Sequence, residues 1–128
     1  MSLFLRLFLS LWAPVVLYMA LIFALSAQSQ PPMPTGVSSA TGHVVGYAGL
    51  AVVILRALAG GLPARITPKA TFGAVAIAVA YGITDELHQM LVPGRTSELI
   101  DVAADAMGAL LGVGASWAWG ILSIRSDV

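Results

Sequence analysis

The sequence has no cysteine and few charged residues. Without cysteine the chain can form no disulfide, perform no thiol chemistry and bind no metal through sulfur. Charged residues make up 9% of the 128 residues and hydrophobic residues 59%, whereas a soluble domain carries about 25% charged residues. Six Lys and Arg residues balance six Asp and Glu residues, so the basic surface that binds nucleic acid is missing. This composition excludes a soluble, disordered or nucleic-acid-binding chain and indicates a protein whose solvent is the lipid bilayer.

Four apolar stretches are long enough to cross the hydrocarbon core, which takes about 20 helical residues. They cover about residues 7–25, 38–57, 70–90 and 98–122, and Ser38 is suited to cap the start of the second. The connections are short and rich in Pro, Gly and Ser, which leaves no room for a second domain. The sequence therefore predicts an all-α fold, a compact antiparallel bundle of four transmembrane helices that forms one domain over residues 1–128.

Positive charge is distributed unevenly between the two ends of this bundle. Arg95 is alone at one end, and the end that carries the termini has the other five cations, Arg6, Arg56, Arg65, Lys69 and Arg125. Because Lys and Arg favour the cytoplasmic side, we expect both termini in the cytoplasm.

The first stretch also has features of a cleavable signal peptide. Arg6 precedes it, and the small residues Ala24, Ser26 and Ala27 end it. The apolar region of a signal peptide is usually about 7–15 residues long, and residues 7–25 exceed that length. A retained membrane span is therefore the favoured interpretation.

Polar residues gather near the predicted outer end of the bundle. His43, Asp85 and Asp105 belong to three different helices, and at about 1.5 Å per residue each lies roughly 8–10 Å below the outer end of its helix. Helical spacing places further polar residues on the same faces, namely Tyr81 and His88 with Asp85, Tyr47 with His43, and Asp101 with Asp105. Ionisable residues within membrane spans are rare and mark functional sites, so this pattern predicts an outward-facing polar cavity. The plainer alternative is that these residues are hydrated helix ends, or pair with Arg95, and only stabilise packing.

Two kinds of chemistry fit this cluster. General acid–base catalysis would use the carboxylic acids and histidines Asp85, Glu86, His88 and His43. A divalent metal ion is the second interpretation, with Asp85, His88 and Asp105 as candidate ligands, although no local metal-binding motif is present. His43, Glu86 and Asp101 could also supply nitrogen or oxygen ligands.

Arg95 lies in a predicted outer turn directly above the acidic cluster. It would either form a salt bridge to Glu98 or Asp101, or hold a phosphate or carboxylate of an amphiphilic ligand, which the planar guanidinium can bind through two hydrogen bonds. The other candidate binding residues are Gln89, Ser26, Gln28, Tyr47, Tyr81, Asp101 and Asp105. Ser26 and Gln28 would either cap the first helix or reach the cavity, and no base is predicted beside Ser26.

Gly108 and Gly112 form a GxxxG pattern on the last stretch, within a longer stripe of small residues. Such stripes let two helix backbones approach closely. The pattern fits packing within the bundle and equally fits an oligomer formed through Gly108 and Gly112.

Five short motifs occur in an order that resembles the VanZ-like family of small bacterial integral membrane proteins. They are LSxQ from residue 25, HxxxY from 43, YGITDELHQ from 81, VPGR from 92, and DxxxDxxGxxxG from 101. The resemblance implies the bacterial cytoplasmic (inner) membrane and a role in the cell envelope. The family is named for a protein associated with resistance to the antibiotic teicoplanin, but the resemblance supplies no reaction. One departure is Ala40, where many members carry a lysine.

These observations predict that the outer cavity binds or modifies an anionic amphiphile of the cell envelope. Lipid-linked wall precursors, phospholipids and glycopeptide- or lipopeptide-like antibiotics belong to this class, and the last would connect the protein to antibiotic resistance. The sequence leaves open whether the protein is an enzyme. A non-enzymatic membrane interaction subunit is the alternative, and proton-coupled transport is disfavoured because the inner halves of the spans carry almost no polar residues.

Overall fold

The computed structural model describes residues 1–62 and 66–126, and this part of the chain contains four α-helices and no strand. They are α1 (Leu3–Ser26), α2 (Ser39–Ala59), α3 (Pro68–Gln89) and α4 (Leu99–Ser126). Each is long and apolar enough to span a membrane, α4 over Leu99–Ile121. The predicted all-α bundle of four membrane-length helices is confirmed.

Short polar side chains fix where three of the helices begin. Ser2, Ser38 and Thr67 each accept a hydrogen bond from the backbone N–H three residues further on, at 3.2, 3.2 and 3.1 Å. Ser38 therefore caps α2 as predicted. The cap at Ser2 also explains why α1 starts four residues earlier than the apolar stretch at residue 7 indicated, because the helix continues outward through the exposed Arg6.

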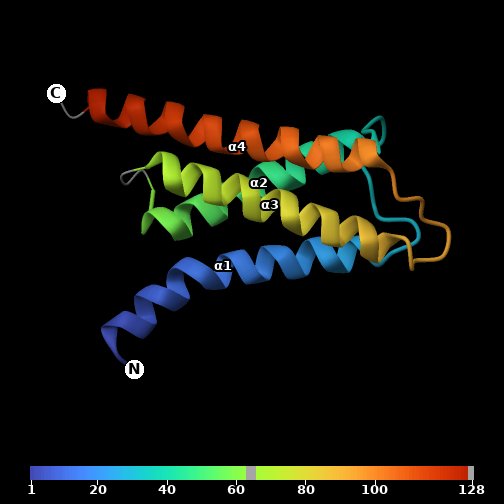
Figure 1. Cartoon of the computed structure of the whole chain (residues 1–128), viewed down its shortest axis with the longest axis horizontal. Helices are drawn as coiled ribbons and strands as arrows, with labels where there is room; N and C mark the ends of the chain where they lie inside the picture. Colours follow the sequence, from blue (N-terminus) through green and yellow to red (C-terminus); the bar gives the residue numbers. More distant parts are fainter. Residues whose placement is uncertain (63–65, 127–128) are drawn as a thin grey trace.

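The helices run antiparallel, with both termini at one end and residues 27–38 and 90–98 at the other (Figure 1). α2 packs most extensively against α4, and α1 packs mainly against α2. Fully buried apolar residues fill the half of the bundle nearer the termini, among them Leu50, Ile54, Leu55, Ala74 and Ala78. Five basic residues led to the prediction that both termini lie in the cytoplasm. Two of them, Arg65 and the side chain of Arg125, lie outside the described part of the structure.

The small-residue stripe of α4 serves packing inside this single chain. Gly108 and Gly112 are buried, and a Cβ atom on either would collide with the backbone carbonyl of Val44 or Ala48 in α2. α2 and α4 therefore touch backbone to backbone, as GxxxG helices do. The two glycines are covered by α2, so an oligomer would have to form through another surface.

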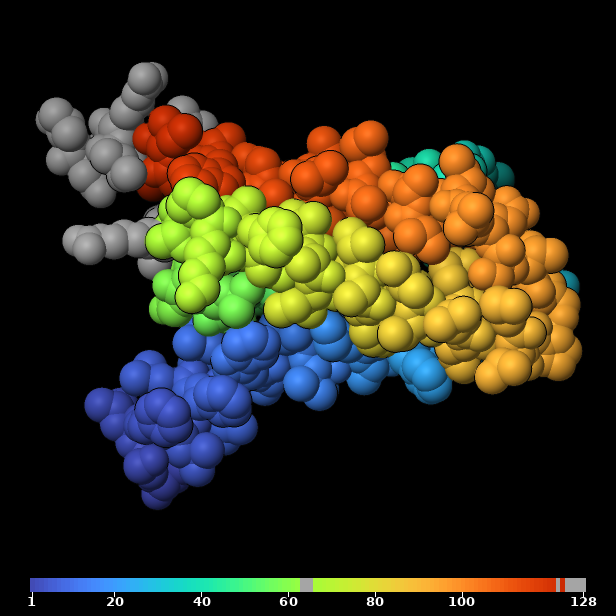
Figure 2. Space-filling model, viewed as in Figure 1, coloured from blue at the N-terminus to red at the C-terminus, as the bar shows by residue number. Residues whose placement is uncertain are grey.

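α1 is the least buried helix, and it turns away from the others towards its N-terminus (Figures 1 and 2). Pro14 lies inside it and cannot donate the backbone hydrogen bond that the carbonyl of Ser10 would otherwise accept. The guanidinium of Arg56 in α2 donates to that carbonyl at 3.0 Å. Large apolar side chains are exposed along α1 on both sides of Pro14, for example Phe8 and Leu17, as expected for a surface that faces lipid.

Candidate functional site

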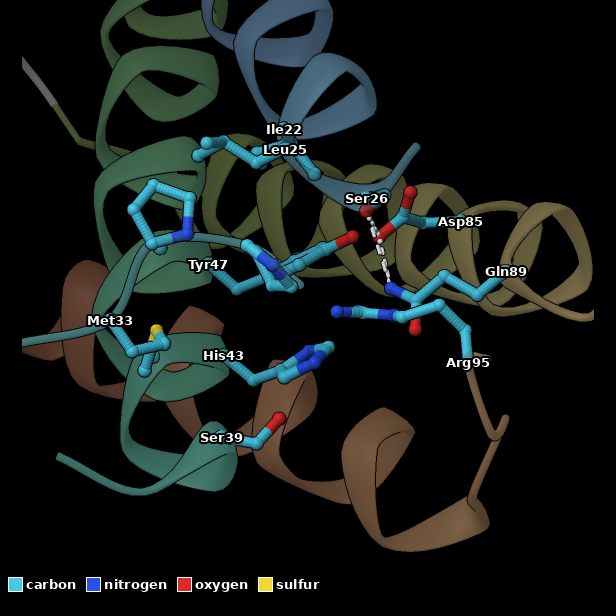
Figure 3. Close-up of a pocket in the computed structure, with 14 residues that line it drawn as sticks. Ile22, Leu25, Ser26, Met33, Ser39, His43, Tyr47, Asp85, Gln89 and Arg95 are labelled. Carbon is cyan, nitrogen blue, oxygen red and sulfur yellow. Dashed lines mark hydrogen bonds between the residues drawn. The ribbon is translucent and has the colours of Figure 1, made fainter. Parts of the chain in front are cut away.

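A cavity of about 370 Å³ lies between α1, α2 and α3 at the end opposite the termini (Figure 3). One part of its wall is apolar and includes Ile22, Leu25, Pro31, Pro32 and Met33. The other part carries the polar side chains of Ser26, Ser39, His43, Tyr47, Asp85, Gln89 and Arg95. Sequence reasoning found most of the polar residues but not the apolar wall, because its two prolines and Met33 come from a loop without helical periodicity.

Ser26, Asp85 and Gln89 form a buried hydrogen-bonded cluster between α1 and α3. The Ser26 hydroxyl donates to Asp85 Oδ2 at 2.6 Å, and Gln89 Nε2 donates to Ser26 Oγ and to Asp85 Oδ2, both at 3.2 Å. Ser26 does not cap α1, since Ala27 occupies the cap position. The sequence predicted no base beside Ser26, but the Asp85 carboxylate lies next to its hydroxyl. The sequence did not indicate that the last turn of α1 packs at the depth of Asp85.

His43 and Asp105 join α2 to α4. His43 Nδ1 and Asp105 Oδ1 lie 2.7 Å apart, and His43 Nε2 lies 3.9 Å from Asp101 Oδ1. Asp105 is fully buried, and the absence of a side chain at Gly82 in α3 makes room for it, because a Cβ there would lie 2.5 Å from Asp105 Oδ2. Sequence reasoning missed Gly82, although a glycine inside a helix beside an ionisable cluster is a usable signal.

Glu86 points towards the same pair. Its Oε2 accepts a hydrogen bond from the Ser97 hydroxyl at 2.9 Å, while its buried Oε1 has no hydrogen-bond partner among the described residues. One ligand atom from each of His43, Glu86 and Asp105 lies within 4.8 Å of the others. Of the metal ligands suggested by the sequence, His43, Glu86 and Asp105 form this group, whereas Asp85, His88 and Asp101 do not belong to it.

The remaining candidates lie around this centre. The His88 ring stacks on Phe23 with ring centres 4.2 Å apart. The Tyr81 hydroxyl donates to the backbone carbonyl of Met19 at 2.6 Å, which joins α3 to α1. Tyr47 lines the cavity, whereas Gln28 is exposed and does not.

Arg95 lies at the mouth of the cavity, with its guanidinium pointing inward (Figure 3). It also lines a smaller, mostly polar cavity of about 290 Å³ together with Ser29, Thr96, Glu98 and Asp101. In the part of the chain that the structure describes, no ion pair joins Arg95 to Glu98 or Asp101. The guanidinium is therefore available to an anion that enters either cavity.

A family model described as VanZ/LLP1 matches residues 2–122, almost the whole chain. No curated protein and no solved structure matches it. The match covers all the polar residues described above.

Proposed function

We propose that this chain, which belongs to the VanZ/LLP1 family, binds an anionic amphiphile of the bacterial cell envelope at the outer face of the cytoplasmic membrane. The observation that carries the proposal is the cavity itself, which combines an apolar wall with a guanidinium that has no ion-pair partner among the described residues. A ligand that satisfies both features has an anionic head group next to hydrocarbon.

The head group belongs at Arg95, where the two cavities meet. A guanidinium binds phosphate or carboxylate oxygens through two parallel hydrogen bonds, which gives orientation as well as affinity. The hydroxyls of Ser39 and Thr96 lie along the same cavities and supply neutral hydrogen-bond donors.

The hydrocarbon part belongs against the apolar wall. Leu25 and Met33 are 37% and 42% exposed, so this wall reaches the surface of the bundle. A cavity of about 370 Å³ holds a head group and the carbons next to it, which is within the usual range of about 300–1,000 Å³ for small-molecule sites. The rest of each chain would stay in the bilayer.

Chemical modification of the ligand is the further step that this cavity supports. Asp85 Oδ2 accepts a hydrogen bond from the Ser26 hydroxyl at 2.6 Å, the arrangement in which a carboxylate can act as a general base, and His43 lines the same cavity. Binding does not depend on this chemistry, so the two are tested separately.

The alternatives have weaker support. An interaction subunit that docks through Gly108 and Gly112 would have to displace α2 from both glycines. Proton-coupled transport requires polar groups across the membrane, whereas Leu50, Ile54 and Leu55 are fully buried in the half of the bundle below the site.

The test measures binding of three anionic amphiphiles to the purified protein in nanodiscs, with phosphatidylcholine as the neutral reference. The three are phosphatidylglycerol, a polyprenyl diphosphate and teicoplanin, and they represent the phospholipid, wall-precursor and antibiotic sources of the anion. Arg95→Gln removes a charged hydrogen-bond donor, which is worth about 1.5–3 kcal/mol. The affinity for the preferred ligand should fall about 10- to 100-fold.

Lys69→Gln is the matched control, because Lys69 is an exposed cation at the opposite end of the bundle. This variant should bind like the unmodified protein. Equal weakening by both substitutions, or no preference for any anionic ligand over phosphatidylcholine, would refute the proposal. Once a ligand is found, mass spectrometry of that ligand after incubation shows whether it is modified and whether Ser26→Ala stops the change.

A further inference from the structure

Three side chains capable of binding a metal converge from three different helices beside the cavity. They are His43 of α2, Glu86 of α3 and Asp105 of α4, and one ligand atom of each lies within 4.8 Å of the others. In a tetrahedral Zn²⁺ site with metal–ligand distances of 2.0–2.2 Å, two ligand atoms lie about 3.3–3.6 Å apart. The three ligand atoms, which lie within 4.8 Å of one another, therefore need to approach by at most about 1.2 Å to share one ion.

Two of these side chains have a buried oxygen atom without a hydrogen-bond partner. Glu86 is 4% exposed and Asp105 is fully buried, yet Glu86 Oε1 and Asp105 Oδ2 have no partner among the described residues. A buried carboxylate oxygen without a partner is unfavourable, and most such atoms in proteins are satisfied by a donor, water or an ion. Both oxygens belong to carboxyl groups of the same three-residue group, so an ion bound there would give these carboxyl groups a further partner.

A bound cation would also offset the negative charge of the cluster when its carboxyl groups are ionised. Asp85, Glu86, Asp101 and Asp105 are all at most 9% exposed. Within the part of the chain that the structure describes, the only basic side chain within 4 Å of any of them is His43. Neutral ligands such as water would satisfy hydrogen bonds but would leave this excess of carboxylates uncompensated.

We infer that His43, Glu86 and Asp105 bind one divalent transition-metal ion, with Zn²⁺ as the best fit and Mn²⁺ as the nearest competitor. One imidazole nitrogen with two carboxylate oxygens suits these ions, whereas Ca²⁺ and Mg²⁺ favour oxygen ligands alone. Three protein ligands leave an open position on the metal. His43 lines the cavity, so the ion lies at the cavity edge, where an anion held by Arg95 can reach it.

The metal site stands independently of the proposed amphiphile, because all three ligands come from the protein. The experiment therefore uses the metal alone. The full chain in detergent is treated with a chelator, returned to metal-free buffer and titrated with Zn²⁺ and then Mn²⁺ by calorimetry, while elemental analysis measures the metal content of the protein as purified. We expect one Zn²⁺ per chain.

Two ligand variants and one control variant separate a true ligand set from general attraction to negative charge. Glu86→Gln and Asp105→Asn each remove a metal ligand. Loss of a residue that only hydrogen-bonds to a ligand lowers metal affinity about 10- to 100-fold, so each of these variants should lower the Zn²⁺ affinity by more than that. Asp85→Asn is the matched control, because it neutralises an equally buried carboxylate of the same cavity that is not one of the three. Its Zn²⁺ affinity should fall by clearly less than that of either ligand variant, because it loses only the attraction of one nearby negative charge and no ligand atom.

Gly82→Ala serves if a ligand variant does not fold. It keeps every charge and ligand, but its Cβ would lie 2.5 Å from Asp105 Oδ2 and would displace that carboxylate. We expect weakened Zn²⁺ binding with unchanged helix content by circular dichroism. Absence of stoichiometric metal in the unmodified protein, or equal loss of Zn²⁺ in Asp85→Asn and Glu86→Gln, would overturn the inference.

Arg95→Gln distinguishes this inference from the proposed function. It should lose the amphiphile and keep Zn²⁺. A protein that binds the amphiphile through Arg95 but takes up no Zn²⁺ would refute the metal site alone, and the reverse result would refute the amphiphile site alone.

Discussion

Replacing Gly108 with alanine should push α2 and α4 apart. The new Cβ would lie 3.0 Å from the carbonyl carbon and from the Cα of Val44, and it would collide with the carbonyl oxygen. Ordinary contact begins at 3.4 Å, so the helices must separate locally by at least 0.4 Å. The obstacle is backbone, which cannot turn aside as a flexible side chain does.

The size of the effect follows from two opposing contributions. Overpacking of a close contact costs about 1–3 kcal/mol, while replacing a helical glycine with alanine returns roughly 0.5–1 kcal/mol. Gly114→Ala is the matched control, since Gly114 is exposed on the same helix and its new Cβ would meet nothing within 4 Å. The propensity gain cancels between the two variants. Gly108→Ala should therefore be less stable than Gly114→Ala by about 1–3 kcal/mol.

Reversible unfolding in mixed detergent and SDS micelles, followed by tryptophan fluorescence, measures this difference. The same separation would stretch the 2.7 Å contact between His43 and Asp105, because His43 adjoins Val44 and Asp105 lies one turn before Gly108. Zn²⁺ affinity should consequently fall in Gly108→Ala and not in Gly114→Ala. If the two variants are equally stable, α2 and α4 do not touch backbone to backbone, and the reasoning fails.

Two further predictions concern α1 and the orientation. Tyr81→Phe removes the hydroxyl that donates to the backbone carbonyl of Met19. The free energy of unfolding should fall by about 0.5–1.5 kcal/mol in the same assay, and the affinity for the amphiphile should not change. An unchanged free energy of unfolding would mean that this hydrogen bond does not hold α1 against α3. Since the chain has no cysteine, single Thr96→Cys and Lys69→Cys variants each carry one thiol that reports the orientation in the membrane. A membrane-impermeant maleimide should label only Thr96→Cys in intact spheroplasts. Labelling of Lys69→Cys alone would refute cytoplasmic termini.

The fold was predictable because it depends on length and composition. Runs of about 20 apolar residues have few alternatives to a membrane-spanning helix, and short loops force neighbouring helices to run antiparallel. Helix ends were less predictable where hydropathy and capping disagree. Hydropathy placed the start of α1 after Arg6, but the cap at Ser2 decides it.

The candidate site was predictable as a set of residues but not as a set of contacts. Residue numbers determine how far along a helix a residue lies and which residues share its face. They were therefore enough to place His43, Asp85 and Asp105 at the same end of the bundle. Which side chain meets which depends on the rotation of each helix about its axis, which sequence numbers do not fix. Asp85 therefore turned out to face Ser26 of α1, whereas Glu86, one residue further on, joins His43 and Asp105.

The glycines connect the packing of the bundle to the chemistry of its polar end. Helices packed through large side chains usually lie about 8–10 Å apart. The contact of Gly108 and Gly112 with Val44 and Ala48 brings α2 and α4 closer than such side chains would allow. This approach lets the short side chain of Asp105 reach His43, and Gly82 opens the space that the carboxylate occupies. A buried polar cluster at membrane depth needs helices close enough to satisfy one another's polar groups, so the small residues of α3 and α4 belong to the site as much as the ionisable residues do.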